Sequence, residues 1–143
     1  MEGAASEGRM NVLVVDDELG IRSVLDMVLK LAGHEARFAT DGDEGLEMFE
    51  RAAAPFDVVI TDHHMERVSG LEMARGLRSK GFTGDIIVIT AYAATFDQRE
   101  YAALNVMGIL KKPFDVGELR RWLEACRLRS EKAGAAVMNA VAG

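Results

Sequence analysis

Short runs of apolar residues, most of them β-branched, alternate along the chain with longer segments of mixed polarity. Short continuous apolar runs are typical of strands that are buried on both faces of a sheet. The clearest runs lie at residues 12–15, 58–60 and 86–89, and two weaker ones lie at 36–40 and 108–110. The pattern therefore predicts five short strands.

The segments between these runs carry apolar residues at helical spacing. The first segment places Ile21, Leu25 and Val28 on one face and ends at Gly33, a common helix stop. Further helices are predicted around residues 46–53, over 70–79, near 96–104 and from 116 onward. The last helix is predicted to carry four residues inward: Val116, Leu119, Leu123 and Cys126. Because each crossover between parallel strands requires a helix-sized connection, the sequence predicts an α/β fold with a five-stranded parallel sheet, doubly wound as (βα)5.

Length and composition fit one such domain. The chain has 143 residues, and its 17 basic and 23 acidic residues give a net charge of −6. We expect the domain to occupy residues 11–130, with an N-terminal tail at 1–10 and a C-terminal tail, in part helical, at 131–143. The acidic total argues against nucleic-acid binding by this domain, since affinity for phosphate backbones comes mostly from Lys and Arg.

The cellular setting follows from what the sequence lacks. Its single cysteine, Cys126, cannot form an internal disulfide, and no Cys and His cluster has zinc-ligand spacing. No apolar run approaches the roughly 18 residues of a membrane span, and the N-terminus lacks the basic-then-apolar order of a secretion signal. We therefore expect a cytoplasmic protein that makes no membrane contact.

Reactive side chains follow four of the five predicted strands. Asp16 and Asp17 open an acidic run after the first strand, Asp62 follows the third, Thr90 ends the fourth and Lys112 follows the fifth. The carboxyl ends of parallel strands meet at one edge of the sheet, where ligands of such folds bind. Clustered carboxylates repel one another unless a cation lies among them, and Mg²⁺ prefers oxygen ligands.

These residues, in this order, resemble the site of a response regulator receiver domain over about residues 10–130. The pair Asp16 and Asp17 matches the acidic residues that bind Mg²⁺ in that family, and Asp62 matches the aspartate that accepts a phosphoryl group. Thr90 matches the family's hydroxyl residue, and Lys112 opens the Lys-Pro-Phe signature. The resemblance implies the flavodoxin-like receiver fold.

The resemblance also implies a role for each residue near the metal. Asp17 and Asp62 would ligate Mg²⁺ directly, together with the backbone carbonyl of His64. Asp16 would act mainly through a bound water. A carboxylate is a competent nucleophile toward phosphorus, so Asp62 would form an acyl phosphate.

Two further residues would hold the phosphoryl group. Lys112 would pair with one of its oxygens and Thr90 would hydrogen-bond another. Lys112 is preferred to Lys111 because side chains alternate along a strand and the family's lysine directly precedes the proline. The donor would be a histidine kinase or a histidine phosphotransfer protein, and the chain would be a signalling phosphoacceptor that catalyses only its own phosphorylation and dephosphorylation.

The sequence departs from the family at two positions. Ile109 stands where an aromatic switch residue is usual, and Glu66 stands where the loop after the acceptor usually has proline. The resemblance implies signalling to a downstream protein through the surface of the fourth helix, fifth strand and fifth helix. The alternative is a degenerate receiver that docks without being phosphorylated, although the presence of all five site residues argues against it.

Two other interpretations, an aspartyl phosphatase and a nucleotide- or flavin-binding domain, match the sequence less well. Phosphatases with an aspartyl nucleophile carry a second aspartate two residues later, where this chain has His64, and both His63 and His64 are expected to be ordinary loop residues. The glycines Gly76 and Gly81 have the spacing of a P-loop, but Phe82 and the residue after it stand where Lys-Ser/Thr is required.

Overall fold

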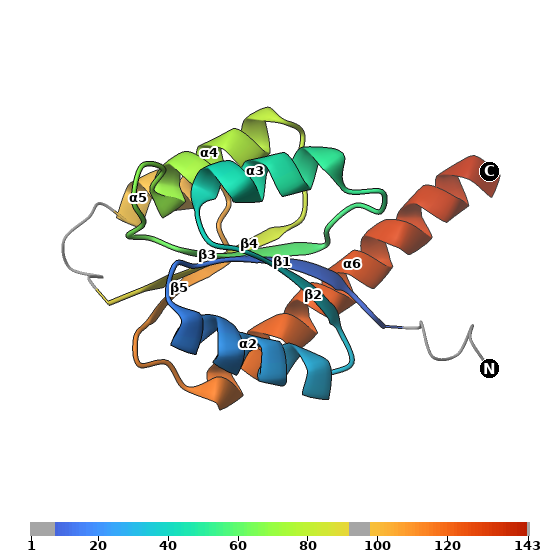
Figure 1. Ribbon diagram of the computed structural model, residues 1–143. Coiled ribbons are helices and arrows are strands. Elements are labelled where there is room, and N and C mark those ends of the chain that lie inside the picture. The colour runs from blue at the N-terminus through green and yellow to red at the C-terminus, as the bar shows by residue number, and fades with distance from the viewer. Residues whose placement is uncertain (1–7, 92–97, 143) are drawn as a thin grey trace.

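Five parallel strands form a single sheet in the order β2-β1-β3-β4-β5 (Figure 1). The computed structural model describes residues 8–91 and 98–142, and side chains as far as residue 133. The strands are β1 (Asn11–Val15), β2 (Glu35–Ala39), β3 (Val58–Asp62), β4 (Asp85–Thr90) and β5 (Gly108–Lys111). The described helices are α2 (Leu19–Leu31), α3 (Gly42–Arg51), α4 (Gly70–Ser79), α5 (Gln98–Ala102) and α6 (Val116–Ala142).

The helices cover both faces of the sheet. Helices α3, α4 and α5 lie on one face, and α2 and α6 lie on the other (Figure 1). Alternate strand residues supply the two halves of the core: Val12 and Val14 pack with the α2 and α6 side, whereas Leu13 and Val15 pack with the α3 and α4 side. Burial on both faces explains why the strands read as continuous apolar runs, and it confirms the predicted doubly wound α/β fold.

Local sequence signals account for several helix ends. Gly33 has a φ of 86°, the left-handed conformation that glycine adopts without steric cost, and it directly follows Ala32, the C-cap of helix α2. Helix α4 begins with a capping box between Ser69 and Glu72. Gly76 lies inside helix α4 and not in a loop, so a phosphate-cradling P-loop at this segment is excluded.

Several predicted boundaries need correction. Met10 was assigned to the N-terminal tail, yet it is buried and its N–H donates to His34 Nδ1 at 3.1 Å. Val116 was expected to face inward, but it is 40% exposed because it lies in the first turn of α6, whereas Leu119 and Leu123 are buried. Helix α6 continues to Ala142, so most of the segment predicted as a C-terminal tail is helical. The start of the helix predicted near 96–104 lies outside the described residues, within which α5 spans Gln98–Ala102.

Within the described residues, no helix combines the length and apolar character needed to cross a membrane.

Candidate functional site

The five predicted site residues lie at the carboxyl edge of the sheet. Strand β1 pairs with β3 so that Val15 lies opposite Thr61. Asp16 and Asp62 are the next residues along these two strands, so they lie at the same level of the sheet edge. Strand β4 pairs with β5 so that Thr90 lies opposite Lys111. Asp16, Asp62 and Thr90 are almost fully buried, with exposed fractions of 1%, 4% and 0%.

Four acidic side chains meet at this edge. Asp16, Asp17, Glu18 and Asp62 each present a carboxylate oxygen within 4.8 Å of the others. Asp16 Oδ1 accepts a hydrogen bond from the Glu18 N–H at 2.8 Å. Its second oxygen, Oδ2, is buried and accepts no hydrogen bond from the residues described. Burial, with a smaller contribution from the charge of Asp62, raises the pKa of Asp16 from 3.8 to about 6.

Lys112 is the cation of this cluster. Its Nζ lies 2.8 Å from Glu18 Oε1, 3.2 Å from Asp62 Oδ2 and 3.4 Å from Asp16 Oδ2. Burial disfavours the ammonium, but the hydrogen bond to Glu18 and the charges of Asp16 and Asp62 outweigh it and raise the pKa of Lys112. The side chain is only 10% exposed, whereas Lys111 is an exposed residue, so geometry favours the predicted choice of lysine.

Asp62 is held from several sides. Burial raises the pKa of its carboxyl group, while the charge and hydrogen bond of Lys112 act against that shift. Its Oδ1 faces the backbone N–H of His64 across 3.4 Å. Gly70 packs against the Asp62 carbonyl so closely that a Cβ at this glycine would lie 2.4 Å from the oxygen. The backbone at Asp62 is therefore packed against Gly70 with no room for a side chain between them.

The donor set fits a small divalent cation. All four acidic groups offer oxygen ligands, and a single lysine offsets their charge within the cluster. Among the described residues the buried Asp16 Oδ2 accepts no hydrogen bond and has only the ion-pair contact with Lys112 at 3.4 Å, so it remains open to a metal cation. Hard cations such as Mg²⁺ bind to sites of this kind. The backbone carbonyl of His64 as a further ligand stays a prediction.

Replacing Asp16 by asparagine is expected to stabilise the metal-free protein. Because the folded pKa of Asp16 is about 6 and the ordinary value is 3.8, the folded state binds more protons between these values. Stability therefore falls as pH rises through this window, by roughly 3 kcal/mol in full. Denaturant unfolding at pH 7 with EDTA should show Asp16→Asn more stable by about 1–3 kcal/mol. The difference in stability between Asp16→Asn and the wild type should vanish as the pH approaches 3.8, the ordinary pKa of the aspartate side chain.

Asp17→Asn is the matched control, because Asp17 is exposed and removing its charge relieves little burial cost. Equal stabilisation by the two variants, or a gain from Asp16→Asn that persists at low pH, would contradict this account of Asp16.

Sequence reasoning missed two features of the site. Glu18, the third acid of the run, was not assigned to the site, yet it makes the shortest contact with Lys112. His63, interpreted as an ordinary loop residue, has its Nδ1 2.5 Å from the hydroxyl of Tyr101, which is 1% exposed. The signal for Tyr101 was a large aromatic residue within a short, mostly polar helix. Glu66 is exposed and lies outside the four-acid cluster.

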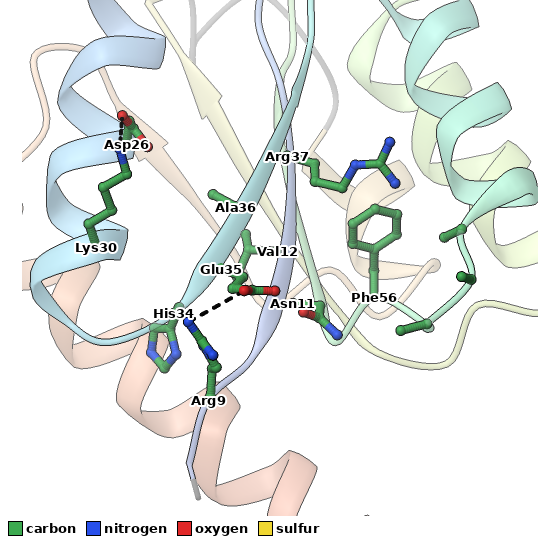
Figure 2. A pocket seen from close by; sticks show the side chains of 13 residues that line it. Arg9, Asn11, Val12, Asp26, Lys30, His34, Glu35, Ala36, Arg37 and Phe56 are labelled. Atoms are coloured by element: carbon green, nitrogen blue, oxygen red, sulfur yellow. Dashed lines mark ion pairs between the residues drawn. The ribbon is translucent and has the colours of Figure 1, made fainter. Parts of the chain in front are cut away.

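A cavity of about 470 Å³ lies at the opposite edge of the sheet (Figure 2). Asn11 and Glu35, which begin strands β1 and β2, are among its lining residues. Two ion pairs line it, Arg9 with Glu35 at 3.4 Å and Lys30 with Asp26 at 3.1 Å. This cavity therefore lies away from the edge where the reactive side chains meet.

Comparison with known proteins agrees with this geometry. A probable transcriptional regulatory protein of Picosynechococcus (SYNPCC7002_A0851) is 36% identical over 78% of this chain and 46% of its own length. The structure of the chemotaxis protein CheY4 from Vibrio cholerae superposes with a TM-score of 0.75 and 31% identity, covering 82% of this chain and 98% of CheY4. This chain spans about half the length of the curated relatives it matches.

A third likeness is to the receiver domain of the sensor histidine kinase PA1611 from Pseudomonas aeruginosa. That structure contains a magnesium ion coordinated in its active-site cleft, and it is 25% identical with a TM-score of 0.73, covering 82% of this chain and 97% of its own. The family profile described as response regulator receiver domain matches residues 12–124. A match over that much of the chain, on a fold and a site of this form, places the protein in the response regulator receiver domain family.

Proposed function

We propose that this domain accepts a phosphoryl group on Asp62 from a histidine kinase or a histidine phosphotransfer protein. The observation that carries the proposal is the buried Asp62 carboxylate, paired at 3.2 Å with Lys112 inside a cluster of four acids. Receiver domains of response regulators are signalling proteins and not turnover enzymes. The chain would therefore act as a phosphorylated switch.

The chemistry follows from the side chains in place. An oxygen of Asp62 attacks phosphorus, the bond from phosphorus to the donor histidine breaks, and the imidazole leaves with the bonding electrons. Lys112 offsets charge on the phosphoryl oxygens, and the Thr90 hydroxyl donates a hydrogen bond to one of them. Mg²⁺, held by Asp16, Asp17, Asp62 and the His64 carbonyl, would supply further neutralisation of phosphoryl charge.

The output would pass to a downstream protein through the face of α5, β5 and α6. Curated relatives include transcriptional regulators such as response regulator MprA of Mycobacterium leprae, which support a regulatory role for the protein that carries this domain. A docking module that is never phosphorylated is the alternative, suggested by Ile109. The ion pairs of Lys112 with Asp16 and Asp62 favour a domain that is phosphorylated over a docking module that is not.

Intact-mass measurement after incubation with acetyl phosphate and Mg²⁺ tests the proposal. The wild-type protein should gain the mass of one phosphoryl group, and EDTA should prevent the gain. Asp62→Asn, which keeps the shape of the side chain but removes the nucleophile, should gain nothing. If the wild type gains no mass from acetyl phosphate or from phosphorylated histidine kinases, the docking module becomes the better account.

A further inference from the structure

A partly buried hydrogen bond connects the residue after the proposed acceptor to helix α5. His63 directly follows Asp62, and its Nδ1 lies 2.5 Å from Tyr101 Oη. The two rings meet edge to face, with centroids 5.6 Å apart and planes inclined by 70°. Tyr101 is 1% exposed and His63 is partly buried, so the tyrosine hydroxyl is shielded from competing water. Leaving a buried hydroxyl without its hydrogen bond costs free energy, so His63 and Tyr101 are held to each other.

The His63 end of this bond cannot move independently of the phosphorylation site. The His63 N–H donates to the Ile89 carbonyl at 2.9 Å, and the His63 carbonyl accepts from the Gly70 N–H at 2.8 Å. A Cβ at Gly70 would lie 2.8 Å from the His63 Cα and 3.0 Å from Tyr101 Oη, so the glycine fills the space between them. A displacement of the Asp62 backbone is therefore passed to the His63 ring, because the surrounding contacts leave no free space to absorb it.

The Tyr101 end belongs to the output face. Tyr101 is the buried residue of the five-residue helix α5, and its carbonyl accepts from the N–H groups of Leu104 and Val106. Tyr101 and Ile109 line one cavity of about 240 Å³ beside β5. Ile109 has neither a hydroxyl nor a ring, so the polar aromatic group at this face comes from the helix and not from the strand.

We infer that the His63–Tyr101 hydrogen bond couples phosphorylation of Asp62 to the position of helix α5. This inference rests on the proposed phosphorylation of Asp62. Tyr101 is a positioning residue that touches no reacting group: it would transmit a change at the acceptor through His63 to the surface between α5 and β5. The inference explains how a receiver domain with isoleucine at position 109 still changes its output face.

Hydrogen–deuterium exchange of residues 98–111, measured with and without acetyl phosphate and Mg²⁺, tests the coupling. Intact mass on the same samples reports the phosphoryl adduct. In the wild type, phosphorylation should change the exchange of this segment. Tyr101→Phe, which removes only the hydroxyl, should form the adduct to the same extent but show a phosphorylation-dependent change at least about threefold smaller, as expected for loss of one coupling element.

Arg75→Gln is the matched control. It removes the exposed ion pair, 2.6 Å long, that also ties α4 to α5 through Glu100, so it loosens the helix without touching the link to the acceptor. This variant should keep the full phosphorylation-dependent change. An equal change in Tyr101→Phe and the wild type overturns the inference while leaving the proposed function intact. Failure of the wild type to form the adduct contradicts the proposed function and the inference with it.

Discussion

Replacing Lys112 by methionine is expected to slow phosphorylation of Asp62 by on the order of a hundredfold, the usual effect of losing one preorganised charge at a reacting group. The Lys112 ammonium lies 3.2 Å from the acceptor carboxylate, where it can also contact the incoming phosphoryl oxygens. The rate of adduct formation with acetyl phosphate, followed by intact mass, measures this loss.

The same variant should also be less stable at pH 7, by about 3 kcal/mol, because the carboxylates of Asp16 and Asp62 would remain buried without their cation. Without Lys112 the pKa of both acids rises further in the folded state. The loss of stability is therefore fully present at pH values above the raised pKa of the two acids, and it disappears as acidification protonates them.

Lys111→Met provides the matched control for both effects. Lys111 is the neighbouring lysine on the same strand, but it is exposed and its side chain points away from the cluster. Its replacement should leave the rate and the stability nearly unchanged. If the two variants lose activity equally, the assignment of Lys112 as the lysine of the site is wrong.

Gly70→Ala is expected to lower the free energy of unfolding by about 2–3 kcal/mol, in the range of other overpacked sites. The new methyl carbon would lie 2.4 Å from the Asp62 carbonyl oxygen and 2.8 Å from the His63 Cα. Both are backbone atoms that cannot rotate away, so the loop carrying the acceptor must shift. Denaturant unfolding measures the loss, and a slower gain of the phosphoryl mass would report the shift of Asp62.

Gly20→Ala makes the same chemical change where there is space. Apart from its chain neighbours and the backbone of its own helix, no heavy atom of the described residues lies within 4 Å of a Cβ at Gly20, and this residue is helical. Its replacement should leave stability unchanged or raise it by up to about 1 kcal/mol. If Gly70→Ala lowers the free energy of unfolding no more than Gly20→Ala does, the loop after Asp62 can accommodate a methyl group and the account of Gly70 is wrong.

Much of the site was predictable because it depends on backbone topology alone. Asp62 and Thr90 end strands β3 and β4 and Lys112 directly follows β5, and the carboxyl ends of parallel strands share one edge whatever the side chains are. The fold was predictable for a similar reason, since strands buried on both faces have continuous apolar runs. The predicted helix over 70–79 agrees with α4 because a capping box marks its start.

What escaped prediction depends on tertiary placement. Glu18 meets Lys112 across 94 positions of sequence, and only the direction of two long side chains in the folded state brings them together. The contact of His63 with Tyr101 requires the position of α5, a five-residue helix too short for periodicity to define its buried face. Met10 was misplaced because one apolar residue before a strand carries no periodic signal.

The central claim, that Asp62 is the phosphoryl acceptor, is tested most directly by trapping the product. Borohydride reduces an aspartyl phosphate to homoserine, so peptide mass spectrometry identifies the residue that carried the phosphoryl group. After phosphorylation with Mg²⁺ present, the account predicts homoserine at position 62 and unmodified aspartate at positions 16 and 17. Reduction at either of those aspartates, or at no aspartate in a protein exposed to its phosphorylated kinase, would contradict it.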